Sequence, residues 1–257
     1  IAAHPDWAAQ LLFAAPDGGA IASKITKIEI ALPHATGDVL VCVDDDIALR
    51  PNALRVLVPP LFQPGIGATF GLACYTNWSN IPSALMSAFV NANALLSYIP
   101  LTYLTDPFTI TGHCFALRRT VWHAAGGLSG MPGRFDDDHE LARRVRGLGL
   151  RAAQTSLIYD VDNRLGTLAA YRAQMRRWFA MPRVAMAPFL TPREQMASLL
   201  GSAASLIPPL LLVLATLRRT RVAWGALAAA LACFAGGYAW CERAYLRQHT
   251  PSCRWPL

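Results

Sequence analysis

Charge is scarce in this sequence. Only 15% of its 257 residues are Asp, Glu, Lys or Arg, whereas an ordinary soluble domain has about 25%. Apolar residues make up 54% of the chain, and disorder requires the opposite balance, low hydrophobicity with high charge. The composition therefore excludes a disordered chain and argues against a purely soluble one. The length suits one large domain or two small ones.

Paired cysteines and nucleic-acid motifs are also missing. No two of the six cysteines have CxxC spacing, so a zinc site is not expected. Scattered cysteines are typical of small apolar side chains in a reducing compartment, and a disulfide framework is the weaker interpretation. The net charge of +7 suits nucleic acid, anionic lipid or a phosphorylated substrate. Nucleic acid is the poorest of these, because no basic segment is interleaved with stacking aromatics.

The chain shows no signal peptide and begins with Ile1 instead of methionine. We therefore expect a fragment that lacks its true N-terminus. We also expect a further segment after Leu257.

Two long uncharged stretches, residues 197–217 and 222–241, lie near the C-terminus. Each is long enough to cross about 30 Å of hydrocarbon as a helix, and Pro208 and Pro209 are expected to kink the first. A buried helical hairpin of a soluble protein is the alternative. The basic linker 218–221 would be cytoplasmic by the positive-inside rule, which conflicts with an arginine-rich region before residue 197 on the same side. Either the pair is re-entrant or the rule fails here.

Residues 1–190 predict an α/β domain, and residues 191–257 a membrane region. The apolar run 39–43, which ends in three aspartates, predicts a buried parallel strand. A helix over 23–35 before it completes half of a βαβ unit. Further helices are expected at 51–57, 83–98, 118–125, 138–148 and 168–181, and further strands at 66–74 and 108–117.

Asp44, Asp45 and Asp46 follow the predicted strand. Ligands of open α/β sheets bind beyond the carboxyl ends of the strands. In an extended segment Asp44 and Asp46 point the same way, so they can share one Mg²⁺ or Mn²⁺ with a diphosphate. An acidic turn before Pro51 is the simpler alternative.

A second acidic cluster, residues 135–140 with the sequence FDDDHE, follows a Gly-Met-Pro-Gly loop. One or two acids in the first turn of a helix favour its dipole, but that effect does not explain four acids and a histidine. A carboxylate crowded by others has a raised proton affinity and can act as a general base.

The basic helix 168–181 carries Gln174, Arg177 and Trp178 on one face. An arginine there can bind a diphosphate through two hydrogen bonds, and a tryptophan beside it can stack on a sugar or close the pocket. A basic amphipathic helix on lipid headgroups is the alternative.

Gly112 and His113 lie within the predicted strand 108–117. A glycine in a strand allows a ligand to approach the backbone closely. A simple strand bulge is a fair competitor.

In combination these motifs resemble one enzyme family. An aspartate pair at a strand end, an acidic cluster about 90 residues later and QxxRW about 35 residues after that follow the order of family 2 glycosyltransferases with a GT-A fold. Bacterial relatives of its ceramide glucosyltransferase branch include a hopanoid-associated glycosyltransferase. The phrases that resemble this branch are SKITKI at 23–28, VDDDI at 43–47, ITGH through LRR at 110–119, AGGL at 125–128 and DDH at 137–139.

The resemblance covers roughly residues 1–190 and implies a Rossmann-like mixed sheet with helices on both faces, followed by transmembrane helices. It implies inverting transfer of glucose or N-acetylglucosamine from a UDP-sugar to a lipid alcohol such as ceramide or a hopanoid. The place implied is a bacterial inner membrane, with the catalytic domain cytoplasmic and the protein multi-pass.

Residue roles also follow from the resemblance. Asp44 and Asp46 match the residues that hold the metal, Mg²⁺ or Mn²⁺, and the UDP diphosphate. Asp138 matches the catalytic base, with Asp137 beside it. The substrate-binding matches are Lys24 near the nucleotide, Gln174, Arg177 and Trp178 near the diphosphate and acceptor, and Gly112 with His113.

Some family features are not matched. The family places a uracil-binding aspartate on an earlier strand that is absent or nearly so here, and Asp6 is not assigned that role. Tyrosine often stands where this chain has His139. An N-terminal membrane anchor and a last membrane helix are also expected to be missing, so the sequence corresponds to a domain truncated at both ends.

Two other functions remain open. A processive polysaccharide synthase of the same superfamily shares QxxRW but carries more membrane helices and a longer chain. A membrane-anchored binding protein with acidic turns and a lipid-facing basic helix would show no metal-dependent UDP-sugar binding.

Overall fold

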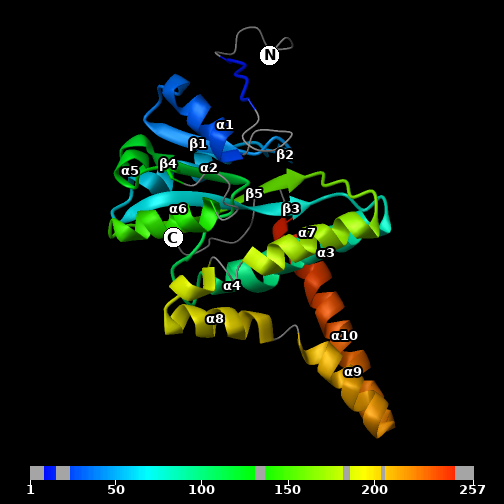
Figure 1. Ribbon diagram of the computed structural model, residues 1–257. Coiled ribbons are helices and arrows are strands. Elements are labelled where there is room, and N and C mark those ends of the chain that lie inside the picture. Colours follow the sequence, from blue (N-terminus) through cyan, green and yellow to red (C-terminus); the bar gives the residue numbers. More distant parts are fainter. Residues whose placement is uncertain (1–8, 16–23, 131–136, 182–185, 204–205, 247–257) are drawn as a thin grey trace.

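A five-stranded mixed sheet forms the centre of the molecule, in a computed structural model that describes residues 9–15, 24–130, 137–181, 186–203 and 206–246. Its strands are β1 (Val39–Val43), β2 (Ile47–Ala48), β3 (Ile66–Tyr75), β4 (Cys114–Arg118) and β5 (Arg151–Val161). The strand order is β1-β4-β3-β5-β2 (Figure 1). Only β3 and β5 are parallel neighbours, but β1 runs in their direction because β4 is antiparallel to both β1 and β3. The predicted α/β class is confirmed.

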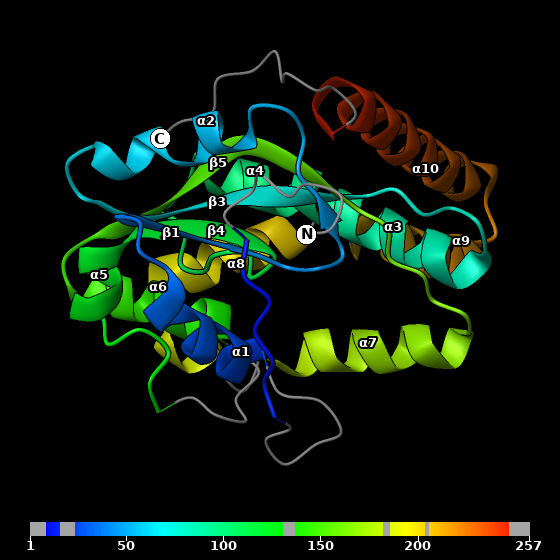
Figure 2. The ribbon, with the colours of Figure 1, turned by 90° about the horizontal axis from the view of Figure 1, so that it is seen from above.

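The helices lie on both sides of this sheet. They are α1 (Lys24–Ala31), α2 (Ala53–Leu57), α3 (Ile81–Asn93), α4 (Ile99–Leu101), α5 (Arg119–Ala124), α6 (Asp137–Gly147), α7 (Leu168–Met181), α8 (Pro192–Ala203), α9 (Ile207–Arg218) and α10 (Arg221–Cys241). Short 3-10 helices cover Leu32–His34, Pro59–Phe62 and Ala187–Phe189, and π-helical turns cover Ala94–Tyr98 and Glu242–Leu246. Seen from above, α1, α5 and α6 lie along one side of the sheet and α2 along the other (Figure 2).

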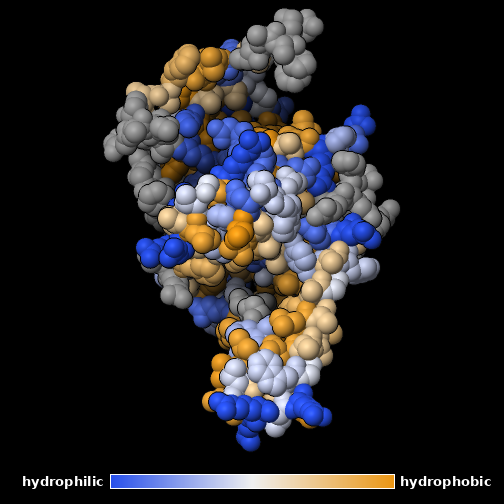
Figure 3. Space-filling view, turned by 90° about the vertical axis from the view of Figure 1, so that its right-hand side faces the viewer, coloured by the Kyte–Doolittle hydropathy of each residue, from blue (hydrophilic) through white to orange (hydrophobic). Residues whose placement is uncertain are grey.

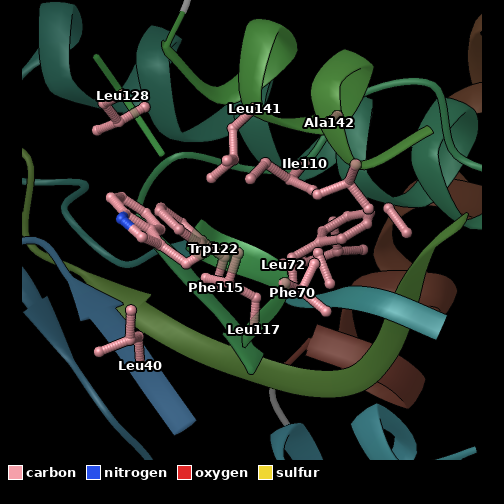
Figure 4. Close-up of a cluster of buried hydrophobic side chains, with 14 of the residues drawn as sticks. Leu40, Phe70, Leu72, Ile110, Phe115, Leu117, Trp122, Leu128, Leu141 and Ala142 are labelled. Atoms are coloured by element: carbon pink, nitrogen blue, oxygen red, sulfur yellow. The ribbon is translucent and has the colours of Figure 1, made fainter. Parts of the chain in front are cut away.

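Alternate residues of the strands point to opposite faces of the sheet and contribute to two apolar cores. On one face, Phe70 and Leu72 of β3 pack with Trp122 of α5 and with Leu141 and Ala142 of α6 (Figure 4). On the other face, the core joins α2, α3 and the sheet through Ala53, Leu57, Met86, Ala73, Tyr75, Cys114 and Tyr159. Every residue of β3 is buried, as expected for a strand with a helix layer on each face.

β5 is a strand that the sequence pattern did not predict. Its apolar run is interrupted by Gln154 and Thr155, which are nevertheless buried. Between the pairs Phe70–Gln154 and Leu72–Ile158, two steps along β3 oppose four along β5, so β5 bulges there. The Thr155 hydroxyl fills part of the bulge by donating to the Phe70 carbonyl at 3.0 Å. The polar interruption therefore belongs to the bulge and does not end the strand.

β1 and β4 differ from their predictions. The run 39–43 was expected to form a buried parallel strand, but in the described structure β1 lies at an edge of the sheet, pairs antiparallel with β4, and has only Leu40 buried. An edge strand has a neighbour on one side only, which explains the exposure. β4 begins at Cys114, opposite Val43, so residues 108–113 precede it as an irregular segment.

The C-terminal region departs most from expectation. In place of one span over 197–217, the structure has α8 ending at Ala203 and a separate α9 of 12 residues. Pro208 and Pro209 stand in the first turn of α9, where proline is tolerated, and therefore do not kink a longer helix. At 1.5 Å per residue, α9 is about 18 Å long, less than the thickness of a bilayer core.

Two helices of the described structure, Ile81–Leu101 and Arg221–Ala244, are long and apolar enough to cross a membrane. The second contains α10, which corresponds to the predicted stretch 222–241. α9 and α10 protrude together from the sheet domain (Figure 1), and the face of the pair seen in Figure 3 is mostly orange to white above a blue, hydrophilic tip.

Candidate functional site

The candidate site lies at the edge of the sheet where β1, β3 and β5 end and β4 begins. Asp44 follows β1, and its backbone N–H donates to the carbonyl of His113 at 2.9 Å, one step beyond the Val43–Cys114 pair. This bond holds the first aspartate beside the turn that precedes β4. The strand directions therefore bring two predicted motifs, 69 positions apart in the sequence, into contact.

Lys24 connects these motifs to α1. Its ammonium group lies 2.7 Å from Oδ1 of Asp44 and also donates to the carbonyl of Gly112. Lys24 is the first residue of α1, and Ile25 next to it is buried in the core, which fixes the start of the helix against the sheet. The predicted nucleotide-side lysine is thus held at the aspartate predicted to bind metal and diphosphate.

Asp137 and Asp138 enter the same site from the start of α6. A side chain placed at Gly112 would begin 3.5 Å from Oδ2 of Asp138 and 3.5 Å from Nζ of Lys24, so Gly112 lies between these two groups. Oδ1 of Asp138 accepts a hydrogen bond from the backbone N–H of His139 at 2.7 Å. The two carboxyls are therefore positioned by the first turn of a helix packed on the core.

The protonation of this pair is governed by burial. Burial, with the Asp137 carboxylate as the second cause, raises the pKa of Asp138 to about 7. Burial also raises the pKa of Asp137, against the opposing effect of Lys24. Asp138 also acts on Tyr98, whose pKa burial raises to about 12. A carboxyl that titrates near neutrality is suited to proton transfer at physiological pH.

The aspartate triplet does not form the extended segment that was expected. Asp45 and Asp46 occupy a tight turn between β1 and β2, with Asp44 half-buried and Asp46 exposed. The turn is required because β2 pairs antiparallel to β5 at the far edge of the sheet. Both Asp44 and Asp46 still act electrostatically on His113.

A metal fits this donor set only with help from a ligand. Asp44 and Asp46 supply carboxylate oxygens, the type that Mg²⁺ and Mn²⁺ prefer. Among the residues that the structure describes, no group of three His, Cys, Asp or Glu side chains could hold a metal ion. Two carboxylates completed by diphosphate oxygens and water match the way Mg²⁺ is usually bound.

His113 and Gly112 lie in the turn before β4 and not within a strand. Nε2 of His113 is 3.4 Å from the Tyr75 hydroxyl, and the two rings meet edge to face. Burial lowers the pKa of His113; Asp44 and Asp46 oppose this effect, and Lys24 and Arg177 add to it. The expected position of Gly112 within a strand, and the alternative of a strand bulge, are both replaced by a turn.

The helix α7 has the predicted bounds. Nη2 of Arg177 donates to Oε1 of Gln174 at 3.0 Å, which confirms that the two share a face. The charge of Arg177 acts on both His113 and Tyr75. The Trp178 ring packs on Phe89 of α3, with centroids 6.2 Å apart, so its contact in this structure is another aromatic ring.

Tyr75, Asn163 and Tyr98 lie outside all of the predicted motifs. Tyr75 ends β3, and its hydroxyl has the Asn163 side chain as a hydrogen-bond partner just beyond β5. The position of Tyr75 directly after the predicted strand 66–74 was a signal, whereas Asn163 follows β5, which was not predicted. Asp6, Phe135 and Asp136 lie outside the described residues.

Three comparisons with known proteins bear on the family. Nothing among curated proteins matches this chain. Among solved structures it is similar to mannosyl-3-phosphoglycerate synthase from Rubrobacter xylanophilus, with 18% identity and a TM-score of 0.31. That match covers 65% of this chain and 55% of the other. The family model of Glycosyl transferase family 21 matches residues 1–255. The chain therefore belongs to glycosyl transferase family 21.

Proposed function

We propose that this chain is an inverting glycosyltransferase that moves a sugar from a UDP-sugar to a lipid alcohol at a membrane surface. One observation carries the proposal: a carboxyl with a pKa near 7, Asp138, lies beside the Lys24–Asp44 pair at the carboxyl edge of the sheet. A base and a charged diphosphate site are what transfer to a hydroxyl requires. The family match supports the reaction class.

The donor end of the site consists of charged groups on three elements. Lys24 and Arg177 supply positive charge for a diphosphate, from α1 and α7 respectively. Asp44 and Asp46 would hold Mg²⁺ or Mn²⁺, which when bound neutralises charge on the departing diphosphate. Gly112 lies between these charged groups and Asp138, and a residue without a side chain allows a ligand to approach the backbone closely.

Asp138 is the proposed base. Above pH 7 it is ionised and can accept the proton of the acceptor hydroxyl as the oxygen attacks the anomeric carbon. The bond between that carbon and the diphosphate oxygen breaks as the new glycosidic bond forms, and inversion follows from attack on the opposite face. Asp137 keeps the proton affinity of Asp138 high.

The membrane is the proposed source of the acceptor. α10 exposes Trp224 near one end and Trp240 near the other, about 24 Å apart along the helix. Tryptophans at both ends of an apolar helix are typical of the two bilayer interfaces. The basic tip, Arg218 to Arg221, then lies beyond Trp224 in the far headgroup region, with the catalytic domain in the cytoplasm of a bacterium. In this arrangement the linker is an exception to the positive-inside rule. Glucose or N-acetylglucosamine as the sugar, and ceramide or a hopanoid as the acceptor, remain part of the proposal.

The test is calorimetric titration of the intact protein in lipid nanodiscs with UDP, with and without Mn²⁺. Wild-type protein should bind UDP more tightly with Mn²⁺, and Asp46→Asn should remove that dependence. Asp106→Asn is the matched control, because this exposed aspartate lies away from the site beside Arg151. UDP binding that changes neither with Mn²⁺ nor with either substitution would contradict the donor site and favour a non-catalytic binding protein.

A further inference from the structure

The helix α3 carries a buried polar stripe that the proposed reaction does not use. Ser83, Ser87 and Asn91 recur at every fourth position, so they share one face of the helix. All three are fully buried. They stand in a segment whose composition is apolar enough for a membrane span.

Each residue of the stripe binds backbone at the carboxyl edge of the sheet. The Ser87 hydroxyl donates to the Asn77 carbonyl at 2.7 Å, and the Ser83 hydroxyl accepts from the Leu165 N–H at 3.0 Å. These bonds hold the segments that follow β3 and β5. They also place α3 in the catalytic domain, against the sheet, despite its apolar composition.

Asn91 makes the most specific of these contacts. Its Oδ1 accepts from the Tyr75 N–H at 2.7 Å, and its Nδ2 donates to the Tyr75 carbonyl at 3.0 Å. β4 pairs with β3 only from Ala68 to Phe70, so no strand continues beside Tyr75 on that side. The amide supplies the donor and acceptor that a neighbouring strand would give.

The protruding helix pair reaches the same asparagine. Glu242, just after α10, is buried, and its Oε1 accepts from Asn91 Nδ2 and from the Tyr238 hydroxyl, both at 3.3 Å. The other end of Tyr75 is its hydroxyl, beside Nε2 of His113. A continuous chain of contacts therefore runs from α10 through Glu242, Asn91 and Tyr75 to the donor site.

We infer that Asn91 and Glu242 are positioning residues, which fix Tyr75 and thereby make the shape of the donor site depend on the docking of α10. The inference rests on the proposed function for its kinetic effect. The contacts described for Asn91 and Glu242 are with Tyr75, with Tyr238 and with each other, whereas Lys24 pairs with Asp44 and Arg177 with Gln174. Removing the contact between Asn91 and Glu242 should therefore change the rate of transfer more than the binding of the donor.

Glu242→Ala and Glu242→Gln test this in the intact protein in nanodiscs. Alanine removes the acceptor of both hydrogen bonds, and glutamine keeps an oxygen in its place. We expect Glu242→Ala to lower kcat at least fivefold with the donor KM within twofold of wild type. Glu242→Gln should stay within twofold in both. Leu231→Ala, which shortens an exposed side chain elsewhere on α10, is the matched control and should change neither.

Hydrogen exchange measured by mass spectrometry gives a second readout that needs no activity. Glu242→Ala should speed exchange in peptides that contain Tyr75 and Asn77, whereas Glu242→Gln and Leu231→Ala should not. Unchanged exchange and unchanged kcat in Glu242→Ala would overturn the inference, as would a glutamine variant as impaired as the alanine one. A wild-type protein that transfers no sugar would overturn the proposed function. The hydrogen-exchange result would still show whether Glu242 and Asn91 hold Tyr75 in place.

Discussion

At the residue scale, Asp138 connects structure to chemistry most closely. Its carboxyl lies next to Asp137, and Gly112 lies between it and Lys24. Burial favours the protonated form, so a residue that is ionised in water titrates near neutrality here. This environment distinguishes a candidate base from the acids that merely open a helix.

The first prediction concerns the rate of transfer. Wild-type activity should rise as pH increases through about 7, because the base must be ionised to accept a proton. Asp138→Asn should lower the rate by about 10²–10⁴-fold. It should also remove the rise of activity with pH, while UDP binding stays intact. Initial rates from pH 5.5 to 8.5 check it. A variant with wild-type turnover would exclude Asp138 as the base.

The second prediction concerns the stability of the same variant. Between pH 3.8 and about 7 the folded protein keeps a proton that the unfolded chain has released, so ionising Asp138 above this range costs stability. Asp138→Asn should therefore raise the melting temperature at pH 8 and change it little below pH 4. Glu29→Gln, at an exposed carboxyl of α1, serves as the control. Equal shifts at both pH values would contradict the burial argument.

At the element scale, the position of α6 is fixed by a buried carboxylate. Glu140 accepts from Arg143 at 2.7 Å and from Arg144 at 2.8 Å, and Arg144 donates onward to the carbonyls of Gly127 and Ser129. Gly127 has a φ of +51°, in the left-handed region that favours glycine. The network joins the helix that carries Asp138 to the turn after α5.

The third prediction tests this network. The bonds from Arg143 hold the pKa of Glu140 down at about 2, so its contribution to stability is present above pH 4.5 and is lost as pH falls toward 2. Glu140→Gln should lower the free energy of unfolding by about 2 kcal/mol at pH 7. The difference should shrink at pH 3. Denaturation at the two pH values measures it, and a difference independent of pH would argue against the charged network.

The fourth prediction concerns the spacing of β3 and β5. A Cβ at Gly71 would lie 2.9 Å from the carbonyl oxygen of Leu157 in the bulge, and backbone cannot move aside cheaply. Gly71→Ala should destabilise the protein by about 1–3 kcal/mol. Gly147→Ala, where a Cβ meets open space at the end of α6, should instead be neutral or stabilise by about 0.5–1 kcal/mol. Thermal unfolding that ranks the two variants alike would contradict the packing.

The sequence pattern predicted the helices better than the edges of the sheet. α7 and β1, the strand before Asp44, both have the predicted bounds, because the sequence patterns that define them are local. β5 was missed because the Thr155 bulge is defined only by its partner β3. Tyr75 and Asn91 carry no motif at all, since their roles come from contacts between elements. Roles set by pairing over long sequence distances cannot be derived from local patterns.

At the scale of the whole molecule, the excess of apolar residues in the composition lies in two places. Part of it forms the two cores on either side of the sheet, and part covers the protruding pair of α9 and α10. Among the described helices α10 is the one that combines spanning length with little burial, because α3 is held to the sheet by its polar stripe.

The fifth prediction follows from this division. Leu231 lies exposed near the middle of α10, and Val222 lies exposed at its tip. An arginine at the centre of a span costs about 2.5–3.5 kcal/mol, and far less near the headgroups. Leu231→Arg should therefore reduce the carbonate-resistant membrane fraction, and Val222→Arg should not. Equal fractions for both variants would show that α10 does not cross the bilayer.

The most direct test of the central claim is a transfer assay on the intact protein in native membranes, with labelled UDP-sugar and lipid extract, comparing wild type with Asp138→Asn. The account predicts a labelled glycolipid from the wild type, with a rate that rises through about pH 7. It predicts loss of that product in the variant while UDP binding persists. A labelled glycolipid formed equally by both proteins would contradict it.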